Sequence, residues 1–458
     1  MLELIKPITI FLVTAFVILW VLLKKFDLLD AIVFFFPFKA LFANLFLMMW
    51  YYQMLIFVVL IQMLLFKKWK NIKLNTWLIV FILYTVTSTV IISNFFIPNW
   101  IDNEFGGFFR TNGRYISTLI KIAIFQVSII VVFHNMIKSH EKIKRLIQIY
   151  LNALVVLCVI GIIQFLFYAA TGVDIYPIDV KADGTARSGV TDLLSSALPF
   201  VRISAIGGEP KGLAASLSIG IVILILGKKF GYNLIKKQKS VLALFFVIWF
   251  LTLSSGGYML IALFGVLLFL LNVIKKEIRI KVNWKSSLFA FLLLATVVRF
   301  SGALYNVLDA RILGRIDSLA SEEADGIIKL FLEDQPKWII FGSGSGNIHN
   351  LAAPYMPEKY KHYLVDNIFV SRYGYLRIIS ENGLVGFFLF LLFIFTIVYK
   401  TNRLSKNNRI DMFWLYLTLT AVLFYMFRAG YVVNEMYFIL GLALAYYTLR
   451  KEEKMALR

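Results

Sequence analysis

Long apolar blocks separated by short polar connections dominate this sequence of 458 residues. The blocks reach roughly 16 to 26 residues, and an α-helix needs about 20 apolar residues to cross about 30 Å of hydrocarbon. The pattern therefore predicts a series of membrane-spanning helices. Counted back from the C-terminus, ten spans are expected near 434–449, 411–427, 383–399, 286–301, 257–274, 240–254, 212–227, 146–170, 115–133 and 75–93.

The start of the chain leaves the number of spans open. Residues 7–23 form one apolar block, whereas 28–66 is almost continuously apolar. One helix in that stretch gives twelve spans and a cytoplasmic N-terminus, and two helices give thirteen and an outside N-terminus. Lys24 and Lys25 favour thirteen, because basic residues prefer the cytoplasmic side. We expect an all-α polytopic membrane protein with about 12 or 13 transmembrane helices.

Composition supports this class of protein. Hydrophobic residues make up 60% and charged residues 16%, with a mean hydropathy of +0.80, whereas a soluble domain carries about 25% charged residues. The net charge of +21 is explained by the membrane topology. Lys and Arg concentrate in every second connection between the apolar blocks, and short loops rich in these residues stay in the cytoplasm. The distribution argues against a nucleic-acid partner. The basic connections are 67–73, 134–145, 228–239, 275–285, 400–409 and 449–458.

Two connections on the opposite face, 171–211 and 302–382, are too long to be simple links. We expect one transmembrane domain, 1–458, that crosses the membrane many times, with these segments as loops on the outside. Long loops of ordinary composition are often functional.

The larger loop carries its own local signals. Acidic residues and a following proline predict a short helix over 322–334. An apolar, strand-like run covers 338–341, and a glycine turn follows at 342–346. Apolar residues on one face predict a second helix over 366–381, with Gly383 beyond its end.

Motifs for metal or nucleotide binding are missing from the sequence. It contains no His-Glu-x-x-His, no EF-hand, no P-loop lysine and no Asp-x-Asp pair. The glycine run at 342–346 lacks the strand–turn–helix context of a dinucleotide site, so a structural turn is the better interpretation. The one cysteine, Cys158, excludes a disulfide within one chain. We expect neither a metal nor a cofactor.

Cationic side chains placed outside the membrane are the strongest candidate chemistry. A guanidinium binds phosphate through two parallel hydrogen bonds and keeps its charge, and outside cations run against the usual charge bias. The alternative is that they reach lipid phosphates or pair with nearby carboxylates. As a cluster they predict a phosphate-bearing lipid substrate. The candidates are Arg202, Lys211, Arg311, Arg315, Arg372 and Arg377, and Arg428 lies in a short outside turn.

Two residues could serve as a general base, His349 and Asp366. A lone loop histidine is more often a surface residue than a catalyst. Asp366 could equally cap the helix expected after it. Both alternatives stay open for each residue.

Five short motifs, which occur in the same order as in a known protein family, indicate a possible relationship. Together they resemble the bacterial O-antigen polymerase/ligase superfamily, the Wzy-type polymerases and their ligase relatives. The motifs are Arg202 followed by Gly-Gly-Glu-Pro-Lys-Gly-Leu-Ala at 207–214, Leu-Thr-Leu-Ser-Ser-Gly-Gly at 251–257, Arg-Ile-Asp-Ser-Leu at 315–319, Phe-Gly-Ser-Gly-Ser-Gly at 341–346 and Tyr-Leu-Arg-Ile-Ile-Ser-Glu-Asn-Gly-Leu-Val-Gly at 375–386.

The resemblance implies a GT-C-like glycosyltransferase that acts on undecaprenyl-diphosphate-linked oligosaccharide without metal or nucleotide-sugar. A chain-length regulator and a flippase are implied as further partners. Arg202 and Arg315 match the family's arginines, with Arg311 close by. Family members often carry His-Asn nine residues before the glutamate that is Glu381 here, but this sequence has Arg372 there. Asp366 and His349 are the candidate substitutes. The resemblance also implies a location in the bacterial inner membrane, with the two long loops in the periplasm.

The missing histidine points away from the ligases, in which it is expected. The sequence also lacks the arginine that commonly follows the serine of the 251–257 motif. The leading hypothesis is an O-antigen or capsule polymerase that transfers a growing glycan from undecaprenyl diphosphate onto a lipid-linked repeat unit. The alternatives are the ligase that joins finished chains to lipid A–core, and a flippase or other transporter. Transporters concentrate polar groups near the membrane midplane, whereas here they crowd into the outside loops.

Overall fold

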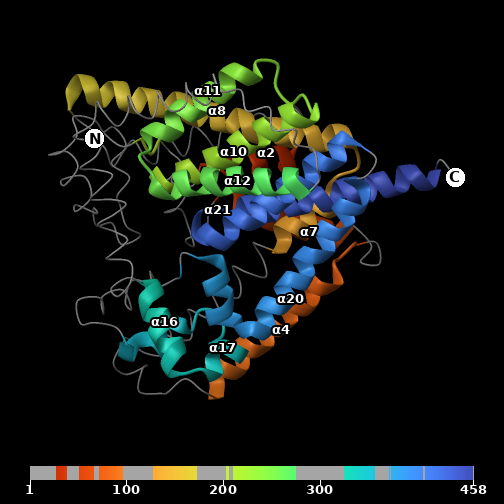
Figure 1. Ribbon diagram of the computed structural model, residues 1–458. Coiled ribbons are helices and arrows are strands. Elements are labelled where there is room, and N and C mark those ends of the chain that lie inside the picture. Colours follow the sequence, from red (N-terminus) through yellow and green to blue (C-terminus); the bar gives the residue numbers. More distant parts are fainter. Residues whose placement is uncertain are drawn as a thin grey trace.

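A computed structural model describes residues 27–38, 51–66, 72–95, 127–172, 203–205, 210–274, 324–355, 371, 373–405 and 408–456. Every regular element in these ranges is a helix (Figure 1). Seven of the described helices are long and apolar enough to cross a membrane. The protein is therefore an all-α, multi-pass membrane protein, as the sequence predicts.

The helices follow the apolar blocks of the sequence. They are α2 (Leu28–Phe35), α3 (Tyr51–Phe66), α4 (Thr76–Phe95), α7 (Val127–Met136), α8 (His140–Thr171), α10 (Pro210–Phe230), α11 (Gln238–Leu251), α12 (Ser255–Ile274), α16 (Ala324–Asp334), α17 (Lys337–Phe341), α18 (Ile348–Ala352), the 3₁₀ turn η4 (Ala353–Tyr355), α20 (Gly374–Ser405) and α21 (Arg409–Ala456).

Most predicted spans correspond to helices, with some differences in length. The span expected at 240–254 is the shorter apolar helix α11, and α7 matches the end of the one expected at 115–133. The spans expected at 7–23 and 286–301 lie outside the described residues. In the stretch 28–66, α2 and α3 are separate helices, with residues 39–50 between them outside the described ranges.

Two long helices are each divided by a break. α20 contains Gly383 at φ 66°, ψ −175°, so its first section is 374–382 and its second crosses the membrane. α21 contains Arg428 at φ −150°, ψ 54°, which separates the spans Arg409–Arg428 and Val432–Ala456. The predicted boundary at Gly383 is confirmed.

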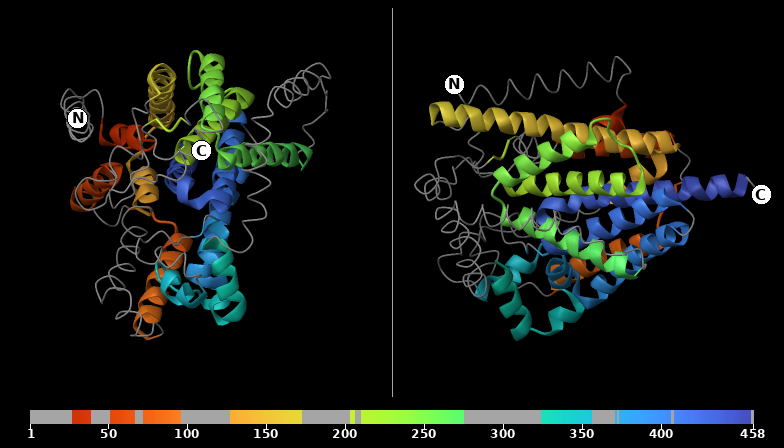
Figure 2. Two further views of the ribbon diagram at one scale, coloured as in Figure 1. Left: turned by 90° about the vertical axis from the view of Figure 1, so that its left-hand side faces the viewer. Right: turned by 45° about the horizontal axis from the view of Figure 1, so that its top comes forward.

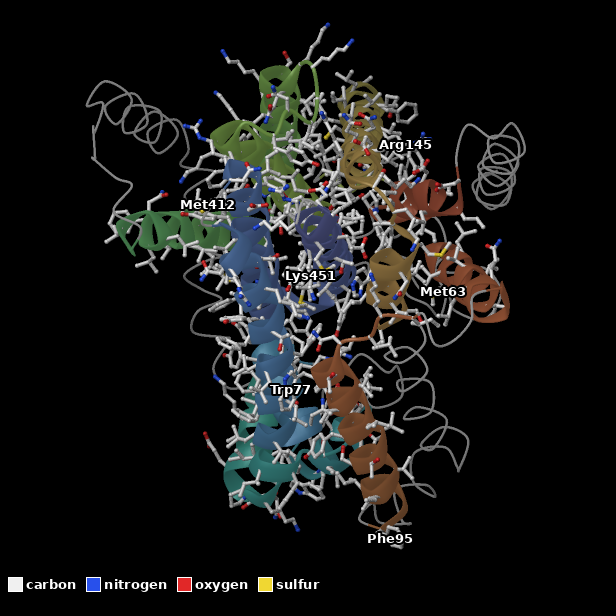
Figure 3. The ribbon with its side chains drawn as sticks, turned by 90° about the vertical axis from the view of Figure 1, so that its right-hand side faces the viewer. Met63, Trp77, Phe95, Arg145, Met412 and Lys451 are labelled. Atoms are coloured by element: carbon white, nitrogen blue, oxygen red, sulfur yellow. The ribbon has the colours of Figure 1, made fainter. Side chains whose placement is uncertain are left out.

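The ends of the helices gather at two opposite ends of the molecule. At the C-terminal end, Lys73 before α4 pairs with Glu452 of α21 at 2.8 Å, and His140 of α8 lies 3.0 Å from Glu453. Lys229 of α10 donates to Asn272 of α12. Figure 3 looks onto this end, where Arg145, Met412 and Lys451 are labelled. The described connections that carry the excess of Lys and Arg therefore lie together.

The opposite end, here called the α16 end, carries the starts of α10, α12 and α20, the end of α4 and the short helices α16–α18 (Figure 1; Figure 2, left). One direct link is the hydrogen bond from Asn347 Nδ2 to Ser93 Oγ at 2.8 Å, which joins the segment before α18 to α4. The starts of α10 and α20, where the two long outside loops of the sequence lead back into helices, therefore lie at the α16 end.

α10 is the most enclosed of the described spans, since 83% of its apolar window is buried. It packs against α8, α11, α12 and α21. Small residues permit this close approach: a Cβ atom on Gly220 would lie 2.5 Å from Leu154 Cδ1 of α8. In a membrane, where lipid is as apolar as a core, such close packing is what holds helices together.

Two details of the large loop differ from the prediction. Residues 338–341, expected as a strand, belong to helix α17, because Pro336 precedes it and a fixed proline φ suits a helix start. A short apolar run does not reveal its period. The helix expected over 366–381 begins only at Gly374. Ser371 organises the turn before it, accepting a hydrogen bond from the Tyr373 amide at 3.2 Å.

Candidate functional site

Two cationic side chains from separate helices meet at the α16 end. Lys211 is the second residue of α10 and follows Pro210, and Arg428 lies at the break in α21. Both line one small, partly open pocket, together with Ala215, Gly256 and Leu260. The pocket therefore combines two positive charges with an apolar wall from α10 and α12.

Gly256 makes room for the arginine. A Cβ atom at this position would lie 3.1 Å from Nε and 3.2 Å from Cζ of Arg428. The next residue, Gly257, brings α12 against α10, because a Cβ atom there would lie 2.8 Å from that of Ala214. The two glycines of the 251–257 motif thus place α12 beside both α10 and Arg428.

A buried carboxylate on α21 contacts α10, and these are the two helices that carry Arg428 and Lys211. Glu435 of α21 is fully buried and accepts a hydrogen bond from Ser216 Oγ at 2.8 Å. Ser216 follows the pocket residue Ala215, and its carbonyl accepts a hydrogen bond from Tyr150 OH of α8 at 3.2 Å. This contact ties the second section of α21 to α10 and holds the walls of the pocket together.

Arg377, a predicted phosphate ligand, forms an ion pair within the first section of α20. Its Nε lies 3.2 Å from Oε1 of Glu381, one helical turn away, and the two side chains are 22% and 6% exposed. The sequence left open whether the outside arginines pair with carboxylates, and this one does. A role for Arg377 in binding phosphate stays a prediction.

The glycine turn binds the end of that same helical section. The amides of Ser343 and Gly344 donate to the carbonyls of Ser380 and Glu381, each at 2.8 Å. The last carbonyls of a helix otherwise lack partners, and the break at Gly383 creates such carbonyls. Two of the five motifs, 341–346 and 375–386, thus form one structural unit.

This turn is also fixed to α4. The Ser345 amide donates to Thr89 Oγ1 at 2.9 Å. Gly342, Gly344 and Gly346 have φ values of 79°, 79° and 82°, a region that favours glycine. A Cβ atom on Gly342 would lie 2.5 Å from the Glu381 carbonyl oxygen. The run is a structural turn, as predicted.

The remaining predicted site residues are not brought together by the described structure. Asp366, Arg202, Arg311, Arg315 and Arg372 lie outside the described residues. His349 belongs to α18 by its backbone, but its side chain is not among those described. Lys211 is the predicted ligand that shares a pocket with a second cation.

Sequence reasoning noted Arg428 as an outside residue but did not place it in the site, and it gave Gly256 no chemistry. The available signal was the coincidence of an arginine in a short outside turn with a glycine pair at the start of a span. Neither Ser216 nor Glu435 carried a signal in the sequence. Among the described residues, no group of three His, Cys, Asp or Glu side chains lies close enough to hold a metal ion.

A hydrogen bond shifts the pKa values of two titratable groups, Asp334 and Tyr355, which lie among the short helices α16–α18 and η4. The Tyr355 hydroxyl, at the end of η4, donates to the carboxylate of Asp334 at the end of α16. This bond lowers the pKa of Asp334, with a smaller contribution from the Gln335 amide, and raises the pKa of Tyr355. The pair lies on an exposed surface away from the pocket.

A scan of the chain against protein-family models found no match, and a search among curated proteins found none either. The resemblance to the O-antigen polymerase/ligase superfamily therefore rests on the five motifs themselves. It remains a prediction from sequence.

Proposed function

We propose that the protein is a metal-independent glycosyltransferase that uses a donor linked to a lipid diphosphate. In its most specific form, it polymerises O-antigen or capsule by transferring the growing glycan from undecaprenyl diphosphate onto a lipid-linked repeat unit. The observation that carries the proposal is the convergence of Lys211 and Arg428 on one pocket beside the apolar wall of α12. A diphosphate joined to a hydrocarbon tail needs both features.

The proposed setting is the bacterial inner membrane, crossed by about 12 or 13 helices, with the α16 end facing the periplasm. The grouping of basic connections at the C-terminal end supports this orientation, because such loops stay cytoplasmic. The lipid-linked oligosaccharide would be the substrate, and a chain-length regulator and a flippase would be partners. The pocket then opens on the side at which exported repeat units arrive.

The proposed chemistry draws its energy from the donor. The acceptor hydroxyl oxygen bonds to the donor's anomeric carbon while the bond from that carbon to the diphosphate oxygen breaks. The electron pair leaves with the diphosphate, and the hydroxyl proton passes to a base, for which Asp366 and His349 are the candidates. Base catalysis of this kind contributes about 10²–10⁴ in rate.

Lys211 and Arg428 would stabilise the negative charge that develops on the departing diphosphate. One preorganised donor in such a site is worth about 3–4 kcal/mol. Arg202, Arg311, Arg315, Arg372 and Arg377 are proposed as further contacts to the diphosphate. Glu435 would act as a positioning residue, since it is buried and joins α21 to α10 through Ser216.

A transporter is the alternative that one observation favours, because carboxylates are buried inside the helical bundle. Asp30 and Asp411 are examples, each below 2% exposed. Both lie in the first turn of their helices, however, and each contacts a basic side chain of this chain. Transport sites instead lie near the membrane midplane, so the transferase is the better-supported function.

The decisive test measures elongation by purified protein. Lys211→Ala and Arg428→Ala are compared with Lys329→Ala, which removes an exposed lysine of α16, using lipid-linked repeat units in detergent. We expect each pocket variant to lose about 10²–10³-fold in rate and the control to stay at the wild-type rate. Elongation without a membrane gradient also excludes a transporter.

Surface polysaccharide on gels provides the matching test in cells. Loss of a polymerase leaves single repeat units on lipid A–core, whereas loss of a ligase leaves long chains on the lipid carrier. Wild-type ladders from both pocket variants at normal protein levels would overturn the proposed role of this pocket.

A further inference from the structure

The short helix α17 exposes large apolar side chains although it belongs to a segment expected outside the membrane. Phe341 is 59% exposed and Ile340 is 48% exposed, whereas Trp338 is buried. Single exposed apolar residues are normal, but a contiguous apolar surface indicates a partner. The surface of α17 therefore needs an explanation.

The exposed residues of α17 lie close to a helix that can span the membrane. α17 packs against α20, and a Cβ atom on Gly383 would lie only 2.2 Å from the Ile340 carbonyl oxygen. Just past Gly383, in the second section of α20, Leu384, Val385 and Phe388 are also exposed, Phe388 by 60%. Exposed apolar side chains are thus present both on α17 and on the part of α20 that follows its contact with Ile340.

A hydrogen bond joins the end of α17 to a helix that is long and apolar enough to cross the membrane. The hydroxyl of Tyr84 donates to the carbonyl of Phe341 at 3.0 Å. Tyr84 lies near the middle of the apolar stretch Thr76–Ser93 of α4. The end of α17 consequently lies beside the apolar stretch of α4.

The backbone amides that follow α17 form their hydrogen bonds within the protein and do not need water. The amides of Gly342, Ser343, Gly344 and Ser345 all donate to protein acceptors, namely Trp338, Ser380, Glu381 and Thr89. Non-helical backbone at membrane depth is tolerated only where protein satisfies and covers it. A turn exposed to water would not need every donor to be paired within the protein.

We propose that the outward surface of α17, formed by Ile340 and Phe341, is embedded among the acyl chains of the adjacent lipid leaflet. The lipid is chosen over another protein because α17 packs against α20, a helix long and apolar enough to cross the membrane, and the residues of α20 just past the contact are apolar and exposed. Lys337, at the start of α17 and over the ring of Trp338 at 5.3 Å, suits the level of the headgroups. The inference does not depend on the proposed enzymatic function.

The test uses a fluorophore attached to single cysteines. The chain has one native cysteine, Cys158, which is buried, and a Cys158→Ala background removes it. Phe341→Cys is labelled with an environment-sensitive dye, and the full protein is placed in bilayers containing lipids with a spin label high on the acyl chain. Phe388→Cys is the control within the membrane, and Glu333→Cys, on the exposed face of α16, is the control in water.

We expect the label at Phe341 to be quenched by the lipid spin label to within about twofold of the label at Phe388, and to resist aqueous iodide. Iodide quenching equal to that at Glu333, without lipid quenching, would overturn the proposal. Protection from both quenchers would also overturn it, because a second copy or another protein would then cover the surface. Ile340→Cys provides a second position if Phe341→Cys does not fold.

Discussion

Arg428 lies directly against Gly256, so that a single methyl group on the glycine would come within 3.1 Å of the guanidinium Nε. The atoms in the way belong to the far end of a flexible side chain. Gly256→Ala should therefore fold but push the guanidinium of Arg428 out of its present position in the pocket by a few tenths of an ångström. If the proposed function holds, we expect elongation to fall by about 10- to 100-fold with little change in thermal stability.

The matched control for this change lies on the same helix. Gly265 of α12 has open space where a Cβ atom would be placed, so Gly265→Ala tests the substitution without the contact. We expect the control to retain activity, since alanine favours a helix over glycine. Equal activity of the two variants would contradict the assigned role of Gly256.

Gly383→Ala tests the connection between α17 and α20. Its φ of +66° is unfavourable for alanine, and the added Cβ atom would lie 2.2 Å from the Ile340 carbonyl oxygen, which belongs to the backbone and cannot turn away. We expect a loss of more than about 3 kcal/mol in stability. Gly172→Ala shares the positive φ but meets no atom within 4 Å, so it should cost only about 1 kcal/mol. Thermal unfolding of the detergent-solubilised variants compares the two, and similar losses would show that crowding at Gly383 is unimportant.

The C-terminal end contains a carboxylate whose burial should matter. Asp30 is fully buried and pairs with Lys142 at 2.6 Å and Arg145 at 2.7 Å. Asp27 contacts the same lysine but is 55% exposed. Asp30→Asn should lower the free energy of unfolding by about 2 kcal/mol, because it removes a buried carboxylate that accepts from both Lys142 and Arg145. Asp27→Asn should cost less than about 1 kcal/mol, since exposed pairs contribute little and asparagine still caps a helix. The reverse order of melting temperatures would be inconsistent with this assignment.

A pH dependence is expected from Asp334 and Tyr355. The hydrogen bond lowers the pKa of Asp334 in the folded protein, so it stabilises the fold above the ordinary carboxyl pKa of about 4. That stabilisation is lost as the pH falls through the lowered value. Tyr355→Phe should therefore melt below the wild type at pH 6, and the difference should shrink toward pH 3. If the difference in melting temperature between Tyr355→Phe and the wild type instead grows as the pH falls, the predicted direction of the pH dependence is wrong.

The membrane class and most span positions follow directly from the sequence, because about 20 apolar residues have few structural options. Local features that do not depend on the length of an apolar block are harder to predict. The run 338–341 was predicted as a strand and is helix α17, since four apolar residues fit either period. The helix before Gly383 was expected from residue 366, whereas it begins at Gly374, after a turn in which Ser371 accepts from the Tyr373 amide. Asp366 lies outside the described residues.

The site could be predicted only in part, because the sequence does not show which distant segments of the chain approach each other in the fold. Lys211 was selected for its charge, but its neighbour Arg428 lies more than 200 positions later, and nothing local indicates that α10 and α21 meet. The pairing of Arg377 with Glu381 was easier to anticipate, because residues four apart share a helix face. The contact of Ser216 with Glu435 depends on tertiary packing alone.

α12 forms one side of the pocket and is poorly covered along the rest of its length, with only 22% of its apolar window buried. It extends outward from the other described helices (Figures 2 and 3). Val266 and Phe269, further along the helix, are more than half exposed. A polyprenyl tail attached to a head group between Lys211 and Arg428 could therefore rest along α12 without leaving the bilayer. Loading would then proceed sideways, by lateral diffusion in two dimensions, and its rate would depend on lipid fluidity rather than on the viscosity of the surrounding water.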